Sequence, residues 1–306
     1  MTFSYSGFRT FLSCQTKWFY ETKAKSAIAK DPFRKRVNVL SNLQTISAWR
    51  GQIVDTTLGE YVITNINKNK DVSLEGAILF AKDLVKRQHA FATGKRYWED
   101  GMKKSGNNNY AALFEVEYGL DVTDKDFRSA WNDIVASLRN FFNNSEFLAY
   151  LKSAEYLISQ RALQFDVYGK NIKGIPDLIV FHEDKPPHII DWKVHFFATK
   201  HYYEQLLIYA LALSECNEHK DFPASFSDFS IYDYRITEYQ LLKNEMRDYP
   251  VTRKYIDDIY MFLAENSYLL ELHGGNKKYT DLDIDDYEKS PKNCLTCSYK
   301  KVCCHE

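Results

Sequence analysis

The sequence lacks three signals, and each absence excludes a class of protein. No run of about 18 apolar residues occurs, so no membrane-spanning helix is predicted. The segment Met1 to Gly7 has no basic stretch followed by an apolar one, so we expect no secretory signal and a cytoplasmic location. No Gly-x4-Gly-Lys-Ser/Thr sequence is present. The chain therefore has no phosphate-binding loop of that type, and any nucleotide-driven motor must be a separate partner.

Composition and charge describe a globular chain. Hydrophobic residues make up 45% and aromatic residues 15% of its 306 residues, enough for one large domain or two modest ones. The net charge of -1 does not point to nucleic acid. Two local basic groups suit a phosphate backbone with stacked bases, although a solvated surface is an equal alternative. They comprise Lys17, Lys23, Lys25, Lys30, Arg34, Lys35 and Arg36 among Trp18, Phe19, Tyr20 and Phe33, and Lys82, Lys86, Arg87, Lys95 and Arg96.

Two apolar stretches in mid-chain carry acidic side chains and are predicted to be strands. They are Gly174 to Phe181, which contains Asp177, and Ile189 to Val194, which contains Asp191 and Lys193. Side chains alternate along a strand, so Asp191 and Lys193 should share one face while Ile190, Trp192 and Val194 occupy the other. The second strand therefore has a polar face backed by an apolar one.

The polar, proline-containing loop His182 to His188 predicts a hairpin between these strands. A hairpin centred on Asp184 pairs positions whose numbers add to 368, which sets Asp177 opposite Asp191. Like charges about 5 Å apart are unfavourable unless a cation lies between them, and Mg2+ or Mn2+ prefers carboxylate oxygens. A register slip of one residue would separate the two carboxylates. In the alternative interpretation, one Asp is a turn or edge residue and Lys193 is its solvated partner.

The six cysteines are unevenly placed and, in a reducing compartment, should be free thiols or metal ligands. Cys294, Cys297 and Cys303 lie close together near the C-terminus, and a C-x2-C turn with a third Cys is a metal-binding arrangement. Three ligands need a fourth, and Cys14 is the candidate. It would tie the two ends of the chain together.

The rest of the pattern is helical in the first half and mixed in the second. Helices are predicted over 6–25, 43–58, 74–101, 124–151, 201–213 and 253–270, and further strands near 156–158, 162–168 and 229–236, the last at the far side of the sheet. Within the helix 43–58, Asp55 is an acid at the end of an otherwise apolar stretch. On the helix 201–213, Gln205 and Tyr209 lie four residues apart and therefore share one face. Alone, each of these polar residues would be read as surface.

In this order, the motifs resemble those of the RecB-like branch of the PD-(D/E)XK nucleases, and within it the iron-sulfur nucleases that include AddB and the CRISPR-associated adaptation nucleases. Gly51-x-x-Val54-Asp55, Gly174-x-x-Asp177, Asp191-Trp192-Lys193 and Gln205-x-x-x-Tyr209 match four successive motifs, and the four cysteines match the cluster ligands. Two positions depart from the family. Asp55 replaces the usual His, which implies an altered metal preference, and Gln15 replaces the Pro that commonly follows the first cysteine.

The resemblance implies an α/β fold with a restriction-endonuclease-like core, in which helices flank a central mixed β-sheet. The chain would be a single nuclease domain (1–306) with a helical insert (60–150) and a metal-cluster clasp that joins 1–30 to 281–306. Asp55, Asp177 and Asp191 would bind Mg2+ or Mn2+, and Lys193, Gln205 and Tyr209 would complete the catalytic group. Cys14, Cys294, Cys297 and Cys303 would bind a 4Fe-4S cluster, with zinc as the alternative and Cys304 and His305 as substitute ligands.

The expected activity is a Mg2+- or Mn2+-dependent deoxyribonuclease, an exonuclease or end-trimming enzyme on single-stranded DNA that leaves a 5'-phosphate and a 3'-hydroxyl. The alternative is a non-catalytic DNA-binding or scaffolding subunit of a helicase-nuclease or defence complex. Neither polarity, the choice between DNA and RNA, nor the setting in DNA repair, CRISPR adaptation, phage replication or antiviral defence follows from the sequence.

Overall fold

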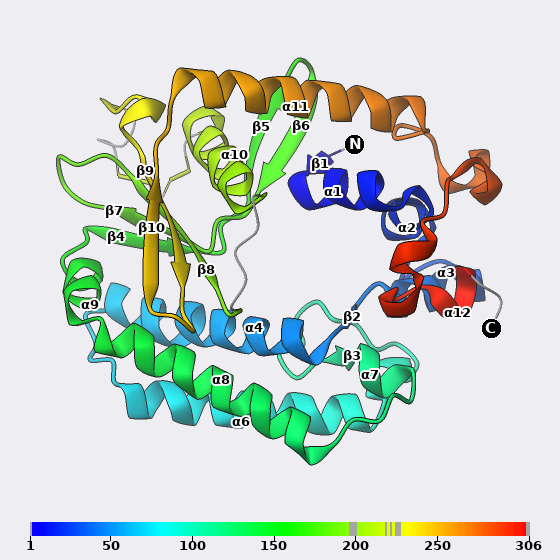
Figure 1. Ribbon diagram of the computed structural model, residues 1–306, viewed down its shortest axis with the longest axis horizontal. Coiled ribbons are helices and arrows are strands. Elements are labelled where there is room, and N and C mark those ends of the chain that lie inside the picture. The colour runs from blue at the N-terminus through cyan, green and yellow to red at the C-terminus, as the bar shows by residue number, and fades with distance from the viewer. Residues whose placement is uncertain (1, 196–200, 218, 221, 224–227, 304–306) are drawn as a thin grey trace. The chain divides into compact units, whose positions relative to one another are not determined.

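The computed structural model describes residues 2–195, 201–217, 219–220, 222–223 and 228–303 (Figure 1). The chain folds into two compact units, each built from three separate stretches. The first, the sheet unit, contains Met1–Tyr5, Arg50–Lys82 and Ala130–Asn266, and the second, the cysteine unit, contains Ser6–Trp49, Asp83–Ser129 and Ser267–Glu306. Residues 60–150 are divided between the units, and their role as an insert stays a prediction.

The sheet unit is built on a five-stranded mixed sheet with the strand order β10-β9-β8-β7-β4. Strands β8 and β9 are parallel, and the other neighbours are antiparallel. A second sheet has the order β1-β6-β5, in which β1 is parallel to β6. The strands are β1 (Thr2–Ser4), β4 (Tyr156–Ser159), β5 (Leu163–Val167), β6 (Lys170–Gly174), β7 (Leu178–Phe181), β8 (His188–Lys193), β9 (Arg235–Gln240) and β10 (Glu245–Tyr249).

Helices cover both faces of the five-stranded sheet. Helix α10 (His201–Glu215) packs on β8 and β9 and also reaches β5 and β6. On the opposite face, Tyr239 of β9 contacts Phe147 with ring centroids 5.4 Å apart, and the Asn140 amide donates to the Leu241 carbonyl at 2.8 Å. The other helices with residues in this unit are α4 (Ile46–Thr56), η2 (Thr57–Ile63), α5 (Thr64–Asn67), α6 (Leu74–Thr93), α8 (Asp124–Asn143), α9 (Ser145–Lys152), η5 (Ile231–Asp233) and α11 (Arg253–Leu272).

The cysteine unit consists mainly of short helices around aromatic side chains. Trp18 and Tyr20 are 1% and 2% exposed, and Tyr20 stacks on Tyr299 with ring centroids 5.0 Å apart. Among the described residues, no helix has the length and apolar character needed to cross a membrane. The elements confined to this unit are α1 (Tyr5–Ser13), which begins at its boundary, α2 (Gln15–Phe19), η1 (Tyr20–Ala24), α3 (Pro32–Leu40), β2 (Leu43–Gln44), η3 (Arg96–Trp98), β3 (Ala112–Leu113), α7 (Phe114–Glu117), η6 (Tyr279–Asp281), η7 (Ile284–Asp286), η8 (Pro291–Thr296) and α12 (Lys300–Cys303).

Two of the predicted strands are wrong in their limits. The stretch Gly174 to Phe181 is not one strand, because β6 ends at Gly174 and β7 begins at Leu178. Pro176 lies in the gap, and a proline has no N–H for the ladder. The strand predicted over 229–236 is displaced to β9, which lies beside β8 rather than at the far side of the sheet. The residues just before β9 form a 3-10 turn (Ile231–Asp233) instead, which begins with a capping box between Ser230 and Asp233.

Two predicted helices are interrupted where a side chain caps a new helix start, and two others differ in their limits. Cys14 caps α2, because its Sγ accepts from the Lys17 N–H at 3.4 Å, and this divides the predicted helix 6–25. Asn144 accepts from the Phe147 N–H at 3.2 Å and separates α8 from α9. The helix predicted to end at Gly101 stops at Thr93, after which Lys95 adopts a left-handed φ of 49°. The helix predicted over 43–58 begins only at Ile46 and continues as helical backbone to Asn67.

Candidate active site and cysteine pocket

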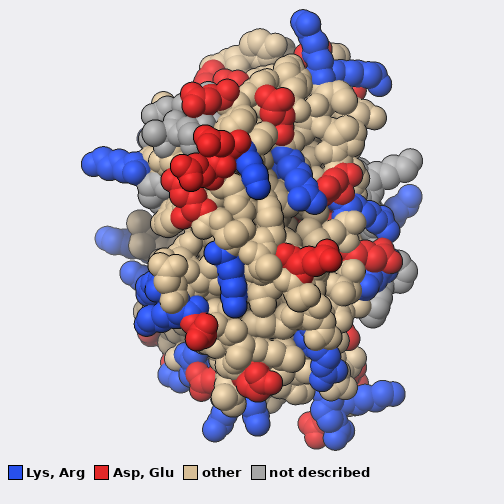
Figure 2. Space-filling view, turned by 90° about the vertical axis from the view of Figure 1, so that its left-hand side faces the viewer, with Lys and Arg blue, Asp and Glu red and all other residues tan. Residues whose placement is uncertain are grey.

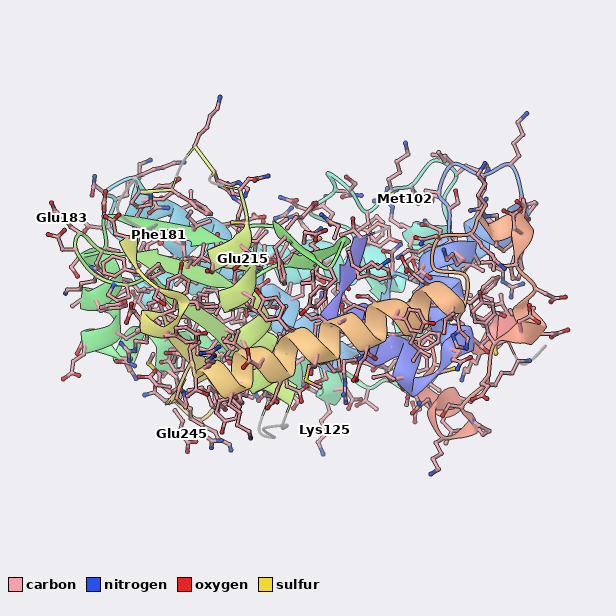
Figure 3. The ribbon with its side chains drawn as sticks, turned by 90° about the horizontal axis from the view of Figure 1, so that it is seen from above. Met102, Lys125, Phe181, Glu183, Glu215 and Glu245 are labelled. Carbon is pink, nitrogen blue, oxygen red and sulfur yellow. The ribbon has the colours of Figure 1, made fainter. Side chains whose placement is uncertain are left out.

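The hairpin β7–β8 has the predicted register. Val180 pairs with His188, Ile179 with Ile189 and Leu178 with Ile190. Asp184 lies at the centre of the connection with a φ of 55°, a left-handed conformation that Asp tolerates in tight turns. Figure 3 shows Phe181 at the end of β7 and Glu183 beyond it, pointing outward. The same register, continued by one residue, sets Asp177 opposite Asp191.

Three carboxylates converge at the start of this hairpin, as the motifs predict. Asp177 precedes β7, Asp191 lies on β8 and Asp55 lies near the end of α4. The backbone N–H of Trp192 donates to Asp177 Oδ2 at 3.0 Å, and the indole Nε1 of the same residue donates to Asp55 Oδ1 at 3.0 Å. Trp192 is 5% exposed, so the face predicted to be apolar also carries a polar contact. One residue of β8 therefore holds two of the three acids.

Electrostatic repulsion within the cluster shows in the pKa values. Burial, followed by the charges of Asp191 and Asp55, raises the pKa of Asp177 well above its usual range. Burial also raises the pKa of Asp55, against hydrogen bonds from Trp192 and Gln160 that lower it. A raised pKa means that the charged form of each carboxylate is less stable here than in water, because burial and the neighbouring carboxylates outweigh the hydrogen bonds and the Lys193 charge that stabilise it.

Gln160, which the motifs did not reveal, lies between two of these acids. Its Nε2 donates to Asp55 Oδ1 at 2.9 Å, to Asp55 Oδ2 at 3.0 Å and to Asp177 Oδ1 at 3.2 Å. A lone glutamine after a strand carries no sequence signal. Only the β4–β7 pairing could have suggested it, since Ser159 pairs with Leu178 and the next residues are Gln160 and Asp177.

Lys193, which is half-buried, forms an ion pair with Oδ2 of the buried Asp191. Burial lowers the pKa of Lys193, but the charges of Asp191 and Asp177 outweigh burial and raise it overall, so the ammonium form is favoured. The Nζ atom lies 5.0 Å from the centre of the Tyr202 ring. Tyr202 was also missed by the motif analysis, although it lies on α10 one turn before Gln205.

Helix α10 presents Gln205 and Tyr209 on one face, as predicted, and the Gln205 amide donates to the Tyr209 hydroxyl. Burial raises the pKa of Tyr209, and the charges of Asp191 and Asp177 raise it further, so the hydroxyl keeps its proton. Gly174 permits the close approach of this helix. A Cβ at Gly174 would lie 3.1 Å from Tyr209 Cδ1 and 3.2 Å from Ala212 Cβ. Close packing against α10 therefore explains why the second motif has a glycine at position 174. At Gly51 of the first motif, an added Cβ would meet no atom within 4 Å.

Arg50 of α4 holds the end of β8. Its Nη2 donates to the Val194 carbonyl at 2.6 Å, and its Nη1 pairs with Asp133 of α8. Trp192 and Val194 are thus both bonded to α4, one residue on either side of Lys193. This arrangement limits the freedom of the lysine along the strand.

The donor set fits a hard divalent cation, since it consists of carboxylate oxygens whose mutual repulsion such an ion would relieve. Within the part of the chain that the structure describes, no group of three or more His, Cys, Asp or Glu side chains is arranged to hold a metal ion. In this arrangement the Gln160 amide donates hydrogen bonds to Asp55 and Asp177, and the Lys193 ammonium pairs with Asp191. The assignment of Asp55, Asp177 and Asp191 as the metal ligands stays a prediction.

The four predicted cluster cysteines line one pocket of the cysteine unit. Cys14, Cys294, Cys297 and Cys303 share this pocket with Lys17, Lys289 and Lys300. The backbone N–H of Tyr299 donates to Cys297 Sγ at 3.5 Å, and burial raises the pKa of the Cys297 thiol. The substitute ligands Cys304 and His305 lie outside the described residues. The donor chemistry fits a thiolate-bound metal centre, although a cluster is not shown.

Three of the four aromatic residues of the first basic group are buried and not available for base stacking, which favours the alternative of a solvated basic surface. Trp18, Phe19 and Tyr20 are at most 2% exposed, because they form the core of the cysteine unit. Phe33 is 37% exposed. Two basic members of the group also serve the fold: Lys23 donates to the Gly275 carbonyl at 2.5 Å, and Arg34 lies 4.7 Å from the centre of the Tyr279 ring. The face of the molecule drawn in Figure 2 carries both basic and acidic side chains.

Comparison with known proteins identifies the family. A model of the PD-(D/E)XK nuclease superfamily matches residues 2–304, so the chain belongs to this superfamily. The α/β fold, with mixed sheets flanked by helices, is consistent with this membership. Membership implies phosphodiesterase chemistry and, as is typical of these nucleases, a divalent metal.

Two solved structures are similar at low sequence identity. A crystal structure from Eubacterium rectale, whose name describes a candidate exonuclease, has a TM-score of 0.46 and 12% identity and covers 98% of this chain and 88% of its own. The structure of SSO0001 has a TM-score of 0.28 and 16% identity and covers 62% of this chain and 78% of its own. No match is found among curated proteins.

Proposed function

We propose that this protein is a Mg2+- or Mn2+-dependent deoxyribonuclease that trims single-stranded DNA ends, of the RecB-like, iron-sulfur type. The observation that carries the proposal is the hairpin register, which brings Asp177 opposite Asp191 with Lys193 on the same face. Binding of nucleic acid alone would not require two like-charged carboxylates beside a lysine that pairs with one of them.

The chemistry follows from the charges at the site. A bound Mg2+ or Mn2+ supplies an activated water and neutralises charge on the phosphate. The Lys193 ammonium lies beside Asp191, where it can orient the attacking water and stabilise the negative transition state. Gln205 and Tyr209, whose side chains are hydrogen-bonded to each other, would orient Lys193 or contact the DNA backbone. The expected products carry a 5'-phosphate and a 3'-hydroxyl.

The test is cleavage of end-labelled single- and double-stranded DNA and of RNA over a series of metal ions. The Lys193→Ala variant should lose cleavage by at least about a thousandfold, because the transition state loses its fixed positive charge. Lys185→Ala, an exposed lysine in the β7–β8 loop, is the matched control and should cleave normally. Equal activity of Lys193→Ala and wild type would remove the catalytic assignment. DNA binding without cleavage under every metal would instead favour the scaffolding subunit.

We further propose that Cys14, Cys294, Cys297 and Cys303 bind a 4Fe-4S cluster with a structural role. Support comes from the pocket that these four thiols share, although they lie up to 289 positions apart in the chain. Anaerobically purified protein should show a broad absorbance shoulder near roughly 400 nm, as expected of iron-sulfur chemistry. Cys297→Ser should abolish the shoulder, whereas Cys216→Ser should retain it. A colourless protein loaded with zinc would contradict the cluster assignment.

A further inference from the structure

Gln160 has a fixed position at the edge of the carboxylate cluster. It follows the last residue of β4, and its backbone N–H donates to the Asp177 carbonyl at 3.3 Å. Its φ of 54° lies in the left-handed region, which is costly for a residue other than glycine. The backbone turn and the ladder contact together direct the side chain toward the two acids.

The side-chain amide of Gln160 sits at the meeting point of three carboxylate oxygens. Both oxygens of Asp55 and Oδ1 of Asp177 lie within 3.2 Å of Nε2. An NH2 group has only two hydrogens, so it cannot give three oxygens a full hydrogen bond each. Oxygens from two acids around one positively polarised atom form the environment that a cation would occupy. The residue is exposed, so the amide reaches this point from the solvent side.

We propose that Gln160 is a positioning residue that holds Asp55 and Asp177 together in the metal-free protein and competes with the divalent ion for their oxygens. An ion that binds both acids must displace the Gln160 amide. The residue therefore sets the ion concentration at which the site fills. This inference rests on the proposed function for the use of the ion, but its binding step depends only on the contacts of Gln160.

Gln160→Met is the variant that isolates the amide. Met has a similar length and faces the same backbone cost at a φ of 54°, but it cannot donate a hydrogen bond. Without the amide, the repulsion between Asp55 and Asp177 is less compensated in the metal-free protein. We expect Mn2+ to bind the variant about tenfold more tightly, because the ion no longer displaces a charge-assisted hydrogen bond. The metal-free variant should also melt at a lower temperature, and added Mn2+ should remove the difference.

Calorimetric titration of the full chain with Mn2+, without DNA, measures this effect directly. Asp177→Asn serves as the blank for the site. Gln164→Met, which changes an exposed glutamine of β5, is the matched control and should leave the dissociation constant unchanged. If Gln160→Met proves unstable, Gln160→Ala replaces it. An unchanged or weaker affinity for Mn2+ in the Gln160 variant would overturn the proposal.

The outcome separates this inference from the proposed function. Tighter Mn2+ binding without any cleavage by the wild-type protein would support the role of Gln160 and reject the nuclease. Normal cleavage by the wild type, combined with equal Mn2+ affinity of the variant, would support the nuclease and reject the role of Gln160.

Discussion

The two units of this protein each hold buried or half-buried acidic groups, and the surroundings shift the pKa values of these acids in opposite directions. In the cysteine unit Glu117 is 5% exposed, and it accepts from Lys301 at 2.6 Å, Trp98 at 2.9 Å and Tyr97 at 3.0 Å. Burial alone would raise the pKa of Glu117, but these hydrogen bonds lower it overall. In the sheet unit, burial and neighbouring carboxylates raise the pKa of Asp177 and Asp55.

The difference distinguishes an acid whose charge is satisfied by its neighbours from acids whose charge is not. Glu117 is satisfied by the chain itself and joins α7 to the C-terminal helix α12 through Lys301. The carboxylates of the sheet unit are left with too little positive charge, which costs stability unless a cation is added. Strongly perturbed acids with an incomplete set of partners are typical of sites where chemistry takes place.

The largest expected effect is that of Asp177→Asn. This variant should lower cleavage at least about a thousandfold, because the metal loses a charged ligand. The same change should raise the free energy of unfolding of the metal-free protein by about 1 kcal/mol, because it removes a repelled charge. A nuclease assay and chemical denaturation in chelator measure the two effects. Asp184→Asn, in the β7–β8 loop, is the control for both; destabilisation by Asp177→Asn would break the comparison.

Glu117→Gln should give the opposite result for stability. It removes the charge that pairs with Lys301 and one of the two acceptor oxygens, which should lower the free energy of unfolding by about 2–4 kcal/mol. Denaturant titration of wild type and variant gives this value. Glu99→Gln changes an exposed acid paired with Arg96 and should alter stability by less than about 0.5 kcal/mol. Equal effects of the two substitutions would mean that the contacts of Glu117 do not stabilise the fold.

The smallest expected effects are changes with pH in the stability difference between each variant and the wild type. Because the folded-state pKa of Asp177 is raised, its stabilising contribution is present below the unfolded pKa and is lost as the pH rises through the folded pKa. The metal-free Asp177→Asn variant should therefore be more stable than the wild type only toward neutral pH. Because the folded-state pKa of Glu117 is lowered, its contribution is present above the unfolded pKa and is lost as the pH falls. Melting temperatures of both variants and wild type across pH, in chelator, should show differences of opposite sign that both shrink in acid.

Local patterns were sufficient for the hairpin and insufficient for several element limits. The register of β7 and β8 was predicted from the short loop between them, because a short loop leaves few ways to pair the two strands that it joins. The strand predicted over 229–236 failed, because the side-chain capping of Ser230 and Asp233 competes with strand pairing over the same residues. The break at Cys14 was also missed, since a cysteine is an uncommon helix cap.

The sequence by itself predicted the acids, the lysine and the three cysteines near the C-terminus, because each of these lies in a short motif, whereas Cys14 was predicted only as their missing fourth partner. It also determined the pairing across the β7–β8 loop. Only the tertiary structure decided which neutral groups meet these acids: Gln160 between Asp55 and Asp177, and Trp192 bonded to Asp55 across 137 positions. It likewise decided that Glu117 meets Lys301, 184 positions away. Such contacts depend on how distant elements pack, and packing leaves no periodic trace in the chain.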